Sequence, residues 1–115
     1  MTTYIVKVPV SGKVEVLPFD KDNSYDQLNK AVEGWLEAVP LIPAIKTSEP
    51  YVIDLFVDEE GLQKALPLNT RLSLFCSAFL AGNAVFAAHD NMGETVGLTK
   101  ADVDSIVKTI NSVVF

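Results

Sequence analysis

Residues 51–57 read YVIDLFV, a stretch of β-branched, aromatic and other apolar residues near the middle of a 115-residue chain. Such residues favour extended structure, so the stretch predicts a strand with Asp54 as its one charge. A second apolar stretch, NAVFAAH at residues 83–89, predicts another strand. We expect both strands to belong to one sheet.

Three more strands are predicted before this central stretch. Residues 3–9 and 14–17 alternate between apolar and polar side chains on either side of a turn, which indicates an opening β-hairpin. Residues 35–41 predict a further strand, although a helix that continues to Ala38 fits the same residues. The proline-rich residues 43–50 then form an irregular connection to the central stretch.

A first helix is predicted between the hairpin and residue 35. Ser24 followed by Gln27 fits a capping box, in which each side chain satisfies a free backbone N–H of the other residue. The helix is expected to end near Glu33, because Gly34 can supply the left-handed residue that closes a helix.

A second helix is predicted after the central stretch. Residues 58–61 read as a turn and residues 62–66 as a brief extended segment. A helix of about ten residues then follows Asn69, a favoured N-cap residue, and Gly82 stands just past its end. Its buried face is predicted to consist of Leu72, Phe75, Cys76 and Phe79.

Arg71, the only arginine, lies in the first turn of this predicted helix, where a cation meets the positive end of the helix dipole. Two arrangements would explain it. A carboxylate of the turn at Asp58–Glu60 could pair with Arg71, or an anionic ligand could bind at the helix N-terminus. In the second case the ligand-binding candidates are Asn69, Arg71 and Trp35, with the tryptophan stacking on a ring.

A last helix closes the predicted fold. Residues 90–97 form a loop, Thr99 caps the helix, and its buried stripe is Val103, Ile106, Val107 and Ile110. The element order is therefore β-β-α-β-β-α-β-α. We predict one α+β domain over residues 1–115, with a mixed or antiparallel sheet of about five strands and three helices against one face.

Charge and length exclude several classes of function. The net charge is -6 and the pI near 4.6, which disfavours direct nucleic-acid binding and anionic membrane surfaces, since both require clustered cations. No stretch reaches the roughly 20 apolar residues of a membrane span. We expect a cytoplasmic protein. The apolar end at 112–115 predicts burial, either in the core or against a second copy in a homodimer.

Few residues offer chemistry. The single Cys76 reads as a core thiol and the single His89 as a structural or surface residue. No spacing typical of a metal or phosphate site occurs, so we expect neither metal nor cofactor. Glu37 and Asp54 could form a catalytic carboxylate pair if they share a sheet face; the alternative is that both face solvent. The sequence therefore favours a non-catalytic protein over an enzyme.

Three segments carry a resemblance to a known family: GWLEAVPL at 34–41, DEEGLQKALPLNTRL at 58–72, and LAGNAVF at 80–86, followed by GLTKADV at 97–103. The chain resembles a family of small domains of unknown function from phages, plasmids and bacteria. The resemblance spans about residues 14–105 and departs from the family pattern at 43–50. The matching positions are Gly34, Glu37, Gly61, Pro67, Asn69, Gly82, Leu98 and Thr99. It implies a cytoplasmic accessory protein of a phage or mobile element in a bacterial host, and no catalytic residues.

Three functions remain open. The first is a non-catalytic protein that binds a host protein, in an anti-defence role for example, through an acidic surface of Glu37, Asp54, Asp58, Glu59 and Glu60. The second is binding or sequestering of a nucleotide-like anion at Asn69 and Arg71. The third is an enzyme that uses the Glu37 and Asp54 pair.

Overall fold

The computed structural model describes residues 2–112, and within them six strands form one sheet in which every pairing is antiparallel. The main strand order is β2-β1-β5-β4-β3, and β6 pairs with β5. The strands are β1 (Tyr4–Val8), β2 (Glu15–Pro18), β3 (Leu36–Val39), β4 (Val52–Asp58), β5 (Ala84–His89) and β6 (Thr95–Val96). The helices are α1 (Ser24–Val32) and α2 (Lys100–Asn111), with the short 3-10 helices η1 (Lys21–Asn23) and η2 (Thr70–Leu74).

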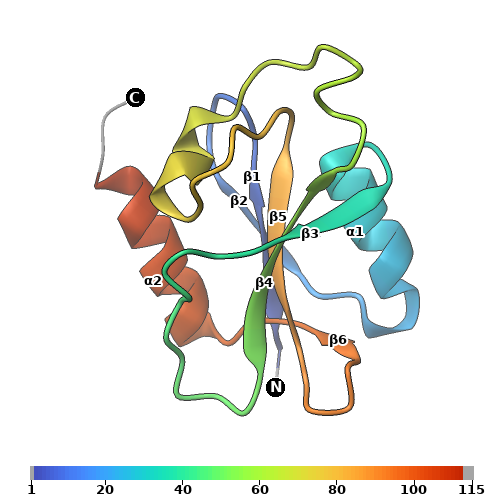
Figure 1. Cartoon of the computed structure of the whole chain (residues 1–115). Coiled ribbons are helices and arrows are strands. Elements are labelled where there is room, and N and C mark those ends of the chain that lie inside the picture. Colours follow the sequence, from blue (N-terminus) through green and yellow to red (C-terminus); the bar gives the residue numbers. More distant parts are fainter. Residues whose placement is uncertain (1, 113–115) are drawn as a thin grey trace.

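The two α-helices cover opposite faces of the sheet, so the prediction that all helices lie on one face is wrong (Figure 1). The reason lies in the central strands, which are apolar on both sides. In β1, Ile5 and Val6 point to opposite faces and both are fully buried, and Val85 and Phe86 do the same in β5. A sheet that is apolar on both faces needs a layer on each.

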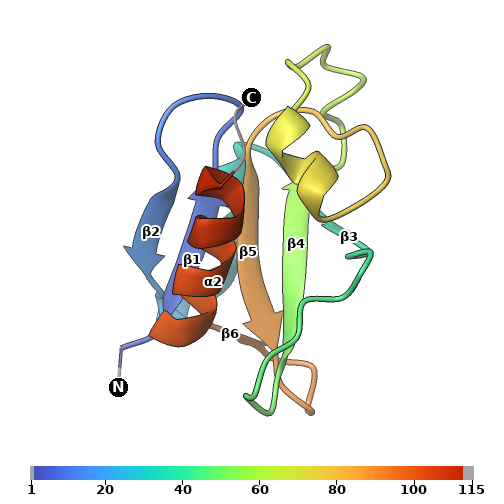
Figure 2. The same cartoon turned by 90° about the vertical axis from the view of Figure 1, so that its left-hand side faces the viewer.

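Each face has its own core. On the face covered by α1, called here the α1 face, the core consists of Ile5, Leu28, Ala31, Val32, Val85 and Ala87. On the other, called the α2 face, α2 and η2 cover a larger core that includes Leu55, Phe86 and Ile106 (Figure 2). There the rings of Phe75 and Phe86 meet edge to face with centroids 4.9 Å apart.

The predicted second helix is wrong: its residues form only the five-residue η2. Leu68 pairs with Ala81 in a β-bridge, and the Asn69 N–H donates to the Leu80 carbonyl. A ten-residue helix would advance about 15 Å, and too few residues would remain to bring the chain back to this bridge. The tertiary contact therefore overrides the helical spacing. Cys76 is nevertheless a buried thiol, as predicted.

The ends of α1 also differ from the prediction, although the helix itself is confirmed. Gln27 does not complete a capping box with Ser24; its amide bridges the Asp20 N–H and the Pro18 carbonyl. The left-handed residue at the C-terminus is Glu33, with φ of 61°, and not Gly34. Gly34 is needed because the Asp58 carboxylate lies where a β-carbon at this position would stand.

Most of the other predicted elements are present in the structure. The opening hairpin, the strand within residues 35–41 and the Thr99 cap of α2 are all present, whereas residues 62–65 form turns and the loop at 90–97 contains β6. No helix in residues 2–112 is both long enough and apolar enough to cross a membrane. Of residues 112–115, for which burial is predicted, Ser112 is exposed, and residues 113–115 lie outside the described residues.

Candidate functional site

The outer edge of β3 presents unpaired backbone groups. β3 is the last strand of the sheet, and the Glu59 N–H donates to the Trp35 carbonyl at 2.9 Å, so the backbone of Trp35 faces β4. Residues of an antiparallel strand direct their backbone groups alternately toward and away from the neighbouring strand. The backbone groups of Glu37 therefore also face β4, and the N–H and C=O groups of Leu36 and Ala38 point outward. The structure gives these outward groups no partner within residues 2–112.

Trp35 and two acids flank this edge. Glu37 is paired with Val57, a residue of the α2-face core, so its exposed side chain lies on the α2 face. Trp35 precedes it with 59% of its surface exposed, and the exposed Glu59 is bonded to Trp35 through the backbone. We call Trp35, Glu37, Glu59 and the outward groups of Leu36 and Ala38 the acidic edge. An exposed indole beside carboxylates suits a cationic side chain.

Asp58 does not belong to the exposed acidic surface. It is buried, and its carboxylate accepts hydrogen bonds from Lys64 Nζ at 2.7 Å and from the Glu60 N–H at 2.9 Å. Burial alone would raise the pKa of Asp58, but these two donors outweigh it and hold the pKa below its ordinary value. The carboxylate lies directly against Gly34, where any β-carbon would overlap it. Glu60 itself is half-buried in the same turn.

Asp54 is separated from Glu37 by the sheet itself. Asp54 is paired with Ala87 on the α1 face, whereas Glu37 lies on the α2 face, so these two residues do not form the predicted carboxylate pair. Asp54 Oδ2 instead lies 2.7 Å from His89 Nδ1. Among residues 2–112 the structure gives His89 no hydrogen bond to a hydroxyl or thiol that it could activate.

Arg71 is structural in a way that neither sequence interpretation anticipated. Its guanidinium donates to the backbone carbonyls of Pro9 and Gly12 at 3.3 and 2.5 Å, and so holds the turn between β1 and β2. The buried Asn69 likewise donates to the carbonyls of Val8 and Gly82, both at 3.0 Å. Trp35 lies on another connection, bonded to Glu59, and the predicted grouping of the three residues around an anion finds no support in these contacts.

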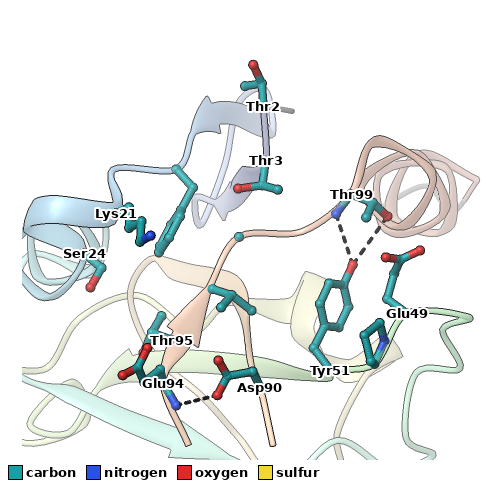
Figure 3. A pocket seen from close by; sticks show the side chains of 14 residues that line it. Thr2, Thr3, Lys21, Ser24, Glu49, Tyr51, Asp90, Glu94, Thr95 and Thr99 are labelled. Carbon is teal, nitrogen blue, oxygen red and sulfur yellow. Dashed lines mark hydrogen bonds between the residues drawn. The ribbon is translucent and has the colours of Figure 1, made fainter. Parts of the chain in front are cut away.

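A cleft of about 940 Å³ opens at the β6 end of the sheet. Figure 3 shows Lys21 and Ser24 on one side and Glu49, Tyr51 and Thr99 on the other. Hydroxyl side chains dominate its polar lining: Thr2, Thr3, Ser24, Tyr51, Thr95 and Thr99. Its charged residues are Lys21, Glu49, Asp90 and Glu94. This excess of carboxylates favours a neutral or cationic ligand over an anion.

One wall of the cleft is fixed by hydrogen bonds to the start of α2. The Tyr51 hydroxyl accepts from the Thr99 N–H at 3.0 Å and donates to Asp102, which also accepts from Thr47 at 2.6 Å. Burial and the Asp102 carboxylate raise the pKa of Tyr51 above its ordinary value of 10.0. The network attaches the connection between β3 and β4 to the helix.

Sequence reasoning missed this network and the His89–Asp54 pair, because both join residues distant in sequence. Only the pairing register of β4 and β5 brings Asp54 near His89, and no local pattern encodes that register. Trp35, Glu37 and Glu59 are candidates from the sequence as well, but there Trp35 is grouped with Asn69 and Arg71, whereas the structure bonds it through the backbone to Glu59.

Within residues 2–112, fold and surfaces define a small α+β domain whose sheet is covered on both faces, with a free acidic sheet edge and a polar cleft. The chain belongs to the family described as a domain of unknown function (DUF3846), whose sequence profile matches residues 1–111. No curated protein matches the chain, and neither does any solved structure.

Proposed function

We propose that this chain is a non-catalytic binding domain that engages another protein through the acidic edge. The observation that carries the proposal is the exposed Trp35 between Glu37 and Glu59, beside unpaired backbone groups of β3. In the setting that the family resemblance implies, the domain is a cytoplasmic accessory protein of a phage or mobile element and its partner is a host protein.

Two features support a protein partner. Large exposed aromatic side chains are costly in water and are enriched where binding energy concentrates at protein interfaces. Acidic side chains at the rim of an interface speed association with basic partners and discriminate against acidic ones.

Affinity capture from a bacterial extract tests this function. The tagged chain is compared with Trp35→Ala and with a matched control, Tyr25→Ala, which removes another exposed aromatic side chain from α1. We expect one or more host proteins that the wild type and the Tyr25 variant retain equally and the Trp35 variant loses. Identical captures by all three proteins would contradict a role for the acidic edge.

The cleft favours a second candidate, binding of a small molecule. Its hydroxyl groups could satisfy a polar ligand, and its size is that of ordinary ligand pockets. The carboxylates Glu49, Asp90 and Glu94 argue for a neutral or cationic compound, so a nucleoside fits this site better than a nucleotide.

Native mass spectrometry of the protein purified from a bacterial host, before and after denaturation, tests this candidate. A released mass that is lost in Thr95→Val, whose side chain keeps its shape without the hydroxyl, would support the cleft. Added adenosine is then expected to bind more tightly than adenosine monophosphate. Binding of the phosphate in preference to the nucleoside would contradict the charge argument.

A further inference from the structure

We propose that the acidic edge binds its partner by strand addition: an extended segment of the partner, with Lys or Arg opposite Glu37, pairs antiparallel with β3. This inference rests on the proposed function and specifies its mode. It follows from the outward direction of the Leu36 and Ala38 backbone groups, from the difference between the two edges of the sheet, and from the charge at residue 37.

The outward backbone groups of β3 supply the hydrogen bonds for an added strand. Leu36 and Ala38 together direct two N–H and two C=O groups away from β4, spaced two residues apart. A partner strand would therefore bond to these two residues, and its residue opposite Glu37 would occupy a non-hydrogen-bonded position, where facing side chains are closest. Recognition by an added strand takes its affinity from main-chain bonds and its specificity from side chains.

The other edge of the sheet is closed to this mode. The Phe19 N–H donates to the Thr3 carbonyl, so the outward positions of β2 are Val16 and Pro18. Pro18 has no N–H, and its carbonyl already accepts from Gln27 Nε2 at 2.8 Å. Proline at an outward position is a common protection of an edge strand. Within β3 no residue gives such protection.

The charge of Glu37 determines which kind of strand can pair with β3. In the two-fold pairing of β3 with a second copy, Leu36 would bond to Ala38 of the other copy and the two Glu37 side chains would face each other. Like charges directly opposite are destabilising, whereas opposite charges stabilise such a pair. Shifting the register would use Gly34, whose N–H already donates to Asn29, or Pro40, which has no N–H. A foreign strand with a basic residue therefore fits better than a second copy.

A displayed library of random ten-residue peptides, selected against the full chain, tests the inference. We expect selected peptides to carry Lys or Arg flanked by β-branched residues. The best synthetic peptide should lose at least about tenfold in affinity to Ala38→Pro, since the variant removes an outward N–H and places a ring in its way. The matched control, Val16→Pro, makes the same change at an outward position of β2 and should bind as the wild type does.

Amide hydrogen exchange on the wild type gives a measurement that does not depend on the variant's folding. Bound peptide should protect the N–H groups of Leu36 and Ala38 and leave that of Glu37, already bonded to β4, unchanged. Failure to select any peptide, equal binding by Ala38→Pro, protection elsewhere, or self-association through β3 would each overturn strand addition. If a host protein is captured through Trp35 and Ala38→Pro captures it equally, the proposed function stands and only strand addition falls.

Discussion

At the scale of single residues, Gly34 and Asp58 form the tightest constraint near the acidic edge. The Asp58 carboxylate occupies the space in which a side chain at residue 34 would begin, and Lys64 and the Glu60 N–H hold it there. Trp35 and Leu36 directly follow Gly34, so this contact sets where β3 starts. The buried acid thus positions the exposed surface and does not itself take part in binding.

Gly34→Ala should destabilise the fold by about 1–3 kcal/mol, because the added methyl group overpacks a site filled by Asp58. Urea unfolding measures the change. In the background of Asp58→Ala the same substitution should do much less, since the obstructing carboxylate is gone. Additive effects of the two substitutions would show that the overlap is relieved in some other way.

Asp58 should also contribute to the acid sensitivity of folding. Its folded pKa lies below the ordinary value of 3.8, so its stabilisation is present above that value and is lost as pH falls through the lowered pKa. Asp58→Asn should reduce stability at pH 7 by about 1.5–3 kcal/mol, the range for hydrogen bonds to charged groups. The difference from the wild type should shrink in unfolding curves at pH 3 and below. A difference that stays constant between pH 7 and pH 3 would rule out the carboxylate as its source.

At the scale of elements, the sequence predicted local structure better than long-range pairing. The hairpin, α1, β4, β5 and α2 are where alternation and helical spacing place them. The predicted helix after Asn69 failed because the bridge between Leu68 and Ala81 requires the chain to return, and no local pattern reports that bridge. The faces of Glu37 and Asp54 depend in the same way on the register of β4 with its neighbours, which the sequence alone leaves open.

Arg71→Ala should loosen the turn between β1 and β2. The guanidinium is the donor that reaches both Pro9 and Gly12, and loss of such bonds typically destabilises by about 1 kcal/mol. Hydrogen exchange should therefore quicken around residues 9–13. Arg71→Lys keeps the charge but lacks the forked donors of the guanidinium, so its exchange rate should lie between those of Arg71→Ala and the wild type. Loss of partner binding with unchanged exchange would instead assign Arg71 to a binding site.

Tyr51→Phe should release the start of α2 from the connection between β3 and β4. The variant loses the bond to Asp102 and the acceptor for the Thr99 N–H, with an expected loss of about 1–3 kcal/mol in unfolding free energy. Thr47→Val removes the other donor to Asp102 and serves as the comparison. A stability equal to that of the wild type in thermal unfolding would mean that water replaces the network without loss.

At the scale of the whole molecule, the two edges of the sheet have different characters. β2 is closed by Pro18 and Gln27, while β3 keeps its outward groups and carries Glu37. The acidic edge and the cleft are formed from different residues, so a protein partner and a small molecule could be tested separately. A predicted homodimer remains a prediction, but the charge at residue 37 argues that β3 is not its interface.

Replacing that charge should convert the free edge into a self-pairing one. In Glu37→Val, two β3 strands could pair with valine facing valine, so sedimentation velocity should show a dimer that grows with protein concentration. Glu15→Val makes the same change on β2 and should leave sedimentation as in the wild type, because Pro18 interrupts that edge.

Glu37→Lys alone should also behave as the wild type, since two lysines repel as two glutamates do. An equal mixture of Glu37→Lys with the wild type should associate, because glutamate then faces lysine across the two edges. Adding Ala38→Pro to the valine variant should abolish the dimer if backbone pairing holds it together. A valine variant that sediments as the wild type does at every concentration would show that Glu37 is not what keeps this edge free.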